Sequence, residues 1–162
     1  MIARARAKKP VPPLQYAVAQ LARREHSRAE LRAKLRRQLR EEMDPAEAAA
    51  EVEKVLDVLQ AKGVLSDARF AAALVRTRAD RFGTARIRHE MREHELPDEV
   101  VRATVEGLQA TEEQRARDVW KRRFGREPAD AAERARQMRF LVQRGFSASV
   151  VMKVVRSAGK DE

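Results

Sequence analysis

The chain has 162 residues, of which 37% are charged, 43% hydrophobic and only 4% aromatic, and it contains six Gly, six Pro and no Cys. This composition favours helices over sheets, and the lack of Cys excludes a disulfide framework, a thiolate nucleophile and a Cys-ligated metal. No stretch approaches the ~20 apolar residues that span a bilayer, and no apolar segment follows the basic N-terminus as it would in a signal peptide. We therefore expect an all-α, cytoplasmic protein that does not contact a membrane.

The positive charge is concentrated at one end of the chain. Residues 1–40 contain twelve Lys and Arg against two Glu, whereas the remaining residues contain 23 basic and 23 acidic side chains, so the net charge of +10 comes from the N-terminal quarter. Such an excess indicates a polyanionic partner. Residues 1–13 are predicted to be a basic, disordered arm, and the N-terminal end is expected to bind the partner most strongly.

Apolar residues at steps of three and four then predict nine helices in three tandem three-helix repeats, over residues 14–62, 63–109 and 110–159. The faces predicted to be buried in the first repeat are Leu14, Val18 and Leu21; Leu31, Leu35 and Leu39; and Ala48, Val52, Val55, Leu56 and Leu59. Those of the second are Phe70 and Leu74; Ile87 and Met91; and Val101, Val105 and Leu108. Those of the third are Ala116, Val119, Trp120 and Phe124; Ala135, Met138 and Val142; and Val151 and Val155.

Capping signals support these helix boundaries. Four residues, each followed three positions later by Glu or Gln, predict capping boxes at Ser27, Asp44, Thr111 and Asp130. The glycines fall just after periodic segments and predict left-handed C-caps at Gly63, Gly83, Gly107, Gly125, Gly145 and Gly159.

An apolar residue precedes the third helix of each repeat, at Met43, Leu96 and Phe146, roughly 50 residues apart. Repeats of this size stack on their neighbours, so we expect an elongated, curved array. The alternative is a single nine-helix globule in which the spacing is accidental.

The second helix carries a basic row. Arg28, Arg32, Arg36 and Arg40 recur every four residues, while the leucines of the same helix face inward. Such a row would meet the phosphates of a nucleic acid with bidentate, sequence-tolerant contacts, although it would also fit a merely solvated face. The candidate residues for binding DNA or a protein partner are Arg23, Arg24, Arg28, Arg32, Lys34, Arg36, Arg37, Arg40, Arg76, Arg78, Arg86, Arg88, Arg92, Lys121, Arg122 and Arg123.

The sequence gives little support for a catalytic or cofactor site. His89 and His94 nearly spell a zinc-binding HExxH motif, but they lie five positions apart and point to different sides of a helix. No Gly-rich phosphate loop occurs, so neither a nucleotide, a metal nor another cofactor is expected. Stacking aromatics interleaved with the arginines are missing, since the aromatic side chains mostly fit packing faces: Phe70, Trp120, Phe124, Phe140 and Phe146. The acidic third helix argues against a sequence-reading helix-turn-helix.

Three segments, taken together, resemble the bacterial RecX family of RecA regulators. They are residues 21–27 (LARREHS) with the helix that follows, residues 63–71 (GVLSDARFA) with residues 75–88, and residues 124–147, which end in RGFS. The matches fall in order across residues 14–156.

The resemblance implies three tandem three-helix repeats and a non-enzymatic function. A protein of this family is expected to bind RecA and its filament on single-stranded DNA, with binding to double-stranded DNA left open. It is also expected to suppress ATP hydrolysis, strand exchange and co-protease activity. The alternative is a stand-alone helical repeat protein that binds nucleic acid without sequence preference.

Overall fold

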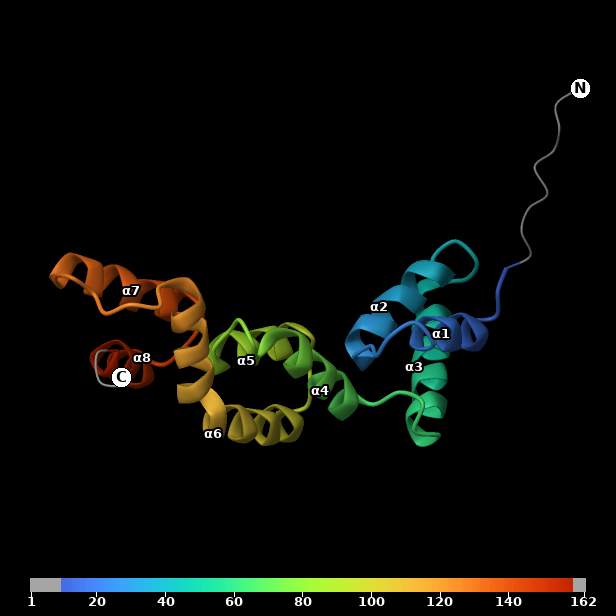
Figure 1. The fold of residues 1–162 in the computed structure, drawn as a ribbon. Helices are drawn as coiled ribbons and strands as arrows, with labels where there is room; N and C mark the ends of the chain where they lie inside the picture. The colour runs from blue at the N-terminus through green and yellow to red at the C-terminus, as the bar shows by residue number, and fades with distance from the viewer. Residues whose placement is uncertain (1–9, 159–162) are drawn as a thin grey trace, which may run out of the picture. The chain divides into compact units, whose positions relative to one another are not determined.

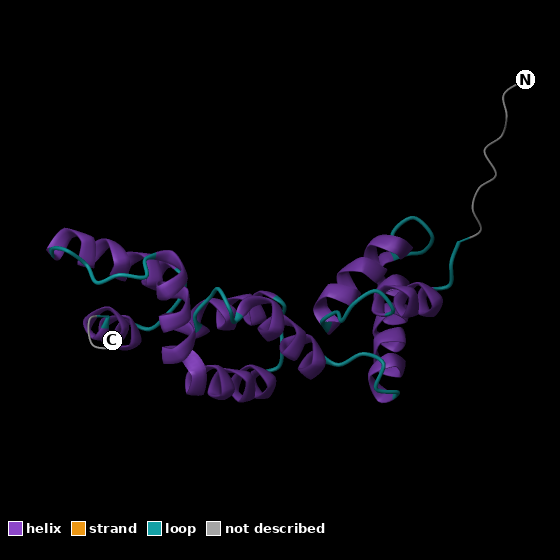
Figure 2. Cartoon of the chain, in the orientation of Figure 1, coloured by secondary structure: helices purple, strands orange, loops and turns teal. Residues whose placement is uncertain are grey.

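The computed structural model describes residues 10–158, which form eight α-helices and no strand (Figure 1, Figure 2). The helices are α1 (Pro13–Leu21), α2 (Arg28–Leu39), α3 (Pro45–Ala61), α4 (Asp67–Arg78), α5 (Thr84–Glu93), α6 (Asp98–Arg123), α7 (Ala131–Gln143) and α8 (Ala148–Ser157). The all-α prediction is therefore confirmed. Residues 1–9 of the predicted arm and the predicted cap at Gly159 lie outside the described residues.

The chain divides into two compact units at Ser66 and Asp67. Unit 1 has one cluster of buried apolar side chains, whereas unit 2 has two, one built on α4, α5 and the start of α6, the other on the end of α6 with α7 and α8. The second and third clusters therefore share one unit. The repeat boundaries at residues 62 and 109 stay predictions.

Unit 1 packs α1 and α2 on α3. Ser27 begins α2 by accepting a hydrogen bond from the Glu30 amide at 3.0 Å, and Asp44 begins α3 by accepting one from Ala46. The predicted inward faces of α2 and α3 are buried. Gly63, with φ of 71°, follows α3 in the left-handed conformation expected of a C-cap.

The buried face predicted for α1 differs from the observed one by a rotation of part of a turn. Leu14 and Val18 are 42% and 45% exposed, while Ala17 is fully buried and Tyr16 and Leu21 pack beside it. The small Ala side chain lets the backbone of α1 approach α2 and α3 closely, which sets the rotation of the helix.

The predicted break between the second and third repeats is absent, so residues 10–158 form eight helices where nine were expected. α6 continues through Gly107 and Thr111, and the Thr111 hydroxyl donates back to the Leu108 carbonyl instead of capping a new helix. The carboxylate of Glu112 is buried and accepts a hydrogen bond from the Thr84 amide at 2.9 Å. This tertiary contact outweighs the cost of about 1 kcal/mol for a glycine inside a helix. Figure 1 shows the bend between the two halves of α6.

The face predicted for α7 is also partly wrong. Val142 is 52% exposed, and the buried residues of the helix are Leu141 and Gln137. The Gln137 side chain accepts a hydrogen bond from the Trp120 indole at 2.8 Å, which fixes how α7 turns on α6. The Asp130 cap of this helix is confirmed by its bond from the Glu133 amide.

Candidate nucleic-acid interface

The basic row of α2 lies on the face next to the one that carries Leu31, Leu35 and Leu39, which are fully or almost fully buried. Its first two members are neutralised within unit 1. A guanidinium nitrogen of Arg28 lies 2.8 Å from Glu53 and 2.7 Å from Asp57, and Arg32 lies 2.5 Å from Glu53. We call this ion-paired cluster the α2–α3 face.

The acidic partners come from the third helix, 21 to 29 residues along the chain. Hydrogen bonds from Arg32 and Arg28 lower the pKa of Glu53 to about 2, so this carboxylate is ionised at any physiological pH. Few acidic residues lie along α2 itself, so the sequence pattern did not reveal these pairs. Half of the predicted row is thus engaged inside the protein.

The remaining candidates of unit 1 have varied surroundings. Arg36, Arg37 and Arg40 are exposed at the end of α2, where positive charge also favours the helix dipole. Lys34 donates to the Gln20 side chain at 3.1 Å, and Arg24 forms an ion pair with Glu30. Arg23 is exposed.

In unit 2, two turns meet backbone to backbone. The Gly83 amide donates to the Arg144 carbonyl at 2.8 Å, and the Ala85 amide donates to the Gly145 carbonyl at 3.2 Å. A Cβ added to Gly83 would lie 2.2 Å from the Gly145 carbonyl carbon, so only glycine permits this approach. Gly83 therefore begins α5 with φ of −76° and is not the predicted left-handed C-cap. We call this contact the glycine seam.

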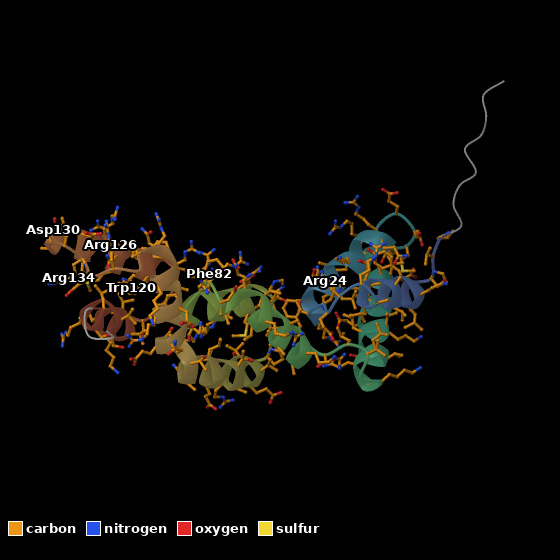
Figure 3. The ribbon with its side chains drawn as sticks, viewed as in Figure 1. Arg24, Phe82, Trp120, Arg126, Asp130 and Arg134 are labelled. Carbon is orange, nitrogen blue, oxygen red and sulfur yellow. The ribbon has the colours of Figure 1, made fainter. Side chains whose placement is uncertain are left out.

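The glycine seam brings together arginines and phenylalanines from segments far apart in the sequence. The Arg86 guanidinium lies 4.7 Å from the centre of the Phe82 ring, and that of Arg144 lies 5.4 Å from the same ring. Arg144 also lies 5.0 Å from the Phe140 ring, which Arg123 approaches at 5.8 Å. These five residues form the Phe82–Arg144–Phe140 surface, and Phe82 is labelled in Figure 3.

Two open recesses border this surface. The larger, about 850 Å³, includes Phe82, Arg86 and Gly145, and the smaller, about 250 Å³, includes Phe140, Arg123 and Arg144. Arg81 lines both. Both recesses are therefore bounded by guanidinium groups and aromatic rings.

Of the candidates in unit 2, Arg86 and Arg123 belong to this surface. Arg122 donates to the Asp80 carbonyl near it, and Arg78 is paired with Glu90 at 2.8 Å. Arg76, Arg92 and Lys121 are exposed, and Arg88 is half-buried.

Phe82 and Arg144 were not among the binding residues predicted from the sequence, and Phe140 was grouped with the aromatics that mostly fit packing faces. Both rings are indeed half-buried and touch hydrophobic clusters, but each also faces arginines. The available signal was the position of Phe82 and Arg144 immediately before two glycines.

Of the two histidines in the HExxH-like segment, His89 lines the larger recess beside this surface. His89 is exposed and pairs with Glu93, whereas His94 packs edge-on against Phe70 at 4.7 Å. Among residues 10–158, no cluster of three or more His, Asp or Glu side chains is arranged to hold a metal ion. No helix in that part of the chain is long and apolar enough to cross a membrane.

The helices and their three buried clusters define an all-α helical-repeat protein with exposed arginines. Family models agree with this class: residues 66–105 match the model described as "RecX, second three-helix domain", and residues 111–155 match "RecX, third three-helix domain". The "Regulatory protein RecX" of Leptothrix cholodnii is 51% identical over 142 residues, which cover 88% of this chain and 86% of the relative. That of Ralstonia nicotianae is 49% identical over 88% of this chain and 85% of its own length.

The chain belongs to the RecX family of regulatory proteins. Solved structures agree on the fold. The crystal structure of RecX from Lactobacillus salivarius has a TM-score of 0.71 at 14% identity, covering 90% of this chain and 94% of that one. A second structure of "regulatory protein RecX" has a TM-score of 0.67 at 20% identity, covering 88% and 72%.

Proposed function

We propose that this protein is a regulator, chiefly an inhibitor, of the RecA recombinase. It binds RecA and the RecA filament on single-stranded DNA, and thereby lowers ATP hydrolysis, strand exchange and co-protease activity without catalysing a reaction itself. The observation that carries the proposal is membership of the RecX family along almost the whole chain. The same proposal places the protein in the cytoplasm, with no cofactor.

The surfaces support a binding mechanism. The sixteen predicted basic residues include exposed arginines on α2, α5 and α6, which suit the phosphates of the DNA or acidic patches on RecA. Bound protein would change RecA activity only if it favoured one filament state over another, since a ligand shifts an equilibrium by its difference in affinity. Either blocked subunit addition or a filament held unfit for exchange would satisfy that condition.

A titration of the full-length protein into a RecA ATPase assay with single-stranded DNA tests the proposal. We expect ATP hydrolysis and strand exchange to fall as the protein is added. Unchanged hydrolysis and strand exchange at saturation would refute it. Heat-denatured protein at the same concentrations is the control for non-specific effects of a basic chain.

The second candidate function is a stand-alone, sequence-nonspecific nucleic-acid-binding protein, which the arginines and rings of unit 2 favour. This function predicts DNA binding with no dependence on any recombinase. A variant that no longer binds DNA but still inhibits RecA would separate the two functions, because it would show that inhibition runs through protein contacts.

A further inference from the structure

We propose that the Phe82–Arg144–Phe140 surface of unit 2 is a binding site for single-stranded nucleic acid. Phosphates pair with Arg86, Arg123 and Arg144, and bases stack against the rings and guanidinium planes. The inference deepens the proposed function by assigning the DNA contact to one surface, but DNA binding without RecA tests it independently.

The first support is charge that lacks an internal partner. Among the described residues, Arg86, Arg123 and Arg144 form no ion pair with a carboxylate, and the contacts found for their guanidinium groups are with aromatic rings. A guanidinium that rests on a ring keeps its N–H fork available for a bidentate contact with a phosphate. The contrast with Arg28, which is bound to two carboxylates, is direct.

The second support is the mixture of cations and rings. A single strand alternates charged phosphates with flat bases, and proteins that bind it combine a positive groove with aromatic platforms. Phe82 and Phe140 are both half-buried, so each ring is anchored in its hydrophobic cluster and yet reaches the surface. The carboxylates of an acidic peptide would pair with the arginines but would not stack on the rings as bases do.

The carboxylates near the surface help to confine the strand. Glu90 and Glu93 line the larger recess together with Phe82, but Glu90 is paired with Arg78 and Glu93 lies 3.5 Å from His89. Because Arg78 balances the charge of Glu90, it is chiefly Glu93 that disfavours phosphate at that end of the recess. The strand is therefore directed toward Arg144 and the smaller recess.

The third support is rigidity. Arg144 touches both rings, which come from segments nearly sixty residues apart, and the glycine seam holds Arg144 against Gly83 beside Phe82. A site built on fixed elements loses little conformational entropy when a ligand binds. Base unstacking is required for such contacts, which is why the ligand is single-stranded.

The test is fluorescence anisotropy of a labelled oligothymidylate with the full chain, without RecA. We expect the double variant R86A/R144A to bind at least roughly tenfold more weakly than wild type, with a salt slope reduced by about 0.7 for each phosphate that is no longer neutralised. The matched control is R28A/R32A, which removes the same charge from the α2–α3 face and should stay within about twofold of wild type. The variant F82L/F140L keeps apolar packing but removes the rings, and it should weaken binding by roughly fivefold or more.

Equal weakening in both double-arginine variants would overturn the proposal, because net charge alone would then explain binding. So would wild-type affinity in both R86A/R144A and F82L/F140L. If R86A/R144A kept its oligonucleotide affinity but no longer bound DNA-free RecA, the surface would be a protein interface and the proposal would fail. Thermal unfolding of each variant checks that unit 2 is folded. Wild-type protein that binds the oligonucleotide but does not inhibit RecA would refute only the proposed function.

Discussion

The α2–α3 face of unit 1 and the Phe82–Arg144–Phe140 surface of unit 2 are both rich in arginine, yet their charges are used differently. On the α2–α3 face, Arg28 and Arg32 are bound to Glu53 and Asp57 of the neighbouring helix. On the surface of unit 2, the guanidinium groups of Arg86 and Arg144 rest on phenylalanine rings.

The difference teaches that the number of basic residues in a segment does not measure how much charge is available to a partner. The net charge of +10 arises in residues 1–40, but part of it is neutralised across α2 and α3. Unit 2 contains 21 basic and 16 acidic side chains, a net charge of +5, and it presents guanidinium groups that rest on rings instead of carboxylates. Whether an arginine pairs with a carboxylate or rests on a ring depends on tertiary contacts between positions far apart in the sequence.

The largest effect on stability is expected from a substitution that removes the glycine seam of unit 2. Gly83→Ala would place a Cβ 2.2 Å from backbone atoms of Gly145, so the two turns must separate and break their hydrogen bonds. We expect unit 2 to become about 3 kcal/mol less stable, and oligonucleotide binding to fall with it. Urea denaturation followed by the fluorescence of Trp120, which lies in unit 2, measures this change.

Gly107→Ala is the matched control, since an added Cβ there meets nothing within 4 Å. It should stabilise α6 by about 0.5–1 kcal/mol. Wild-type stability of Gly83→Ala would contradict the role given to the seam.

The next largest effect on stability is expected at the buried hydrogen bond between Glu112 and Thr84 in unit 2. Glu112→Ala removes the acceptor of the Thr84 amide and leaves that amide buried without a partner, which should cost about 1–3 kcal/mol. Glu112→Gln keeps an acceptor oxygen and should cost less. Hydrogen exchange at the Thr84 amide should accelerate in the Ala variant, and an unchanged rate there would count against this contact.

A smaller effect concerns the α2–α3 face in acid. The Arg32 and Arg28 side chains lower the pKa of Glu53 from 4.5 to about 2, so the ion pairs stabilise unit 1 above pH ~4.5 and lose their contribution as the pH falls through about 2. Because the Glu53 side chain is 40% exposed, we expect no more than about 1 kcal/mol.

Hydrogen exchange of α2 amides in wild type and Glu53→Gln measures this contribution. The two proteins should differ at pH 5 and converge toward pH 2. A difference that stays constant across that range would contradict the assignment.

The smallest effect is expected at His26, which is buried in unit 1. Burial lowers its pKa below 6.5, partly offset by the Arg24 carbonyl and by Glu30. The unfolded state therefore takes up a proton first as the pH falls below 6.5, and unit 1 loses stability there. Unit 1 of His26→Gln should melt at nearly the same temperature at pH 7.5 and pH 5.5, whereas that of wild type should melt lower at pH 5.5. A wild-type melting temperature independent of pH would contradict this.

The local features of the fold were predictable from the sequence. Ser27 and Asp130 cap the helices that follow them, and Leu31 is buried as its spacing predicts. The break at Thr111 was predicted wrongly, because Glu112 contacts Thr84, 28 residues earlier, and no local pattern reveals that contact.

The candidate site was less predictable for the same reason. Spacing along α2 identified the basic row but not its partners on α3, which lie 21 to 29 residues further on. Phe82 and Arg144 meet only through the glycine seam. Pairing across turns depends on how helices pack, whereas capping and amphipathicity are properties of neighbouring residues.

Ultraviolet cross-linking of oligothymidylate to the full-length protein, with the adducts located by mass spectrometry, tests the central claim most directly. We predict adducts on the peptides that contain Phe82 and Phe140, both with the protein alone and with RecA filaments present. Adducts confined to residues 23–40 of unit 1 would contradict it.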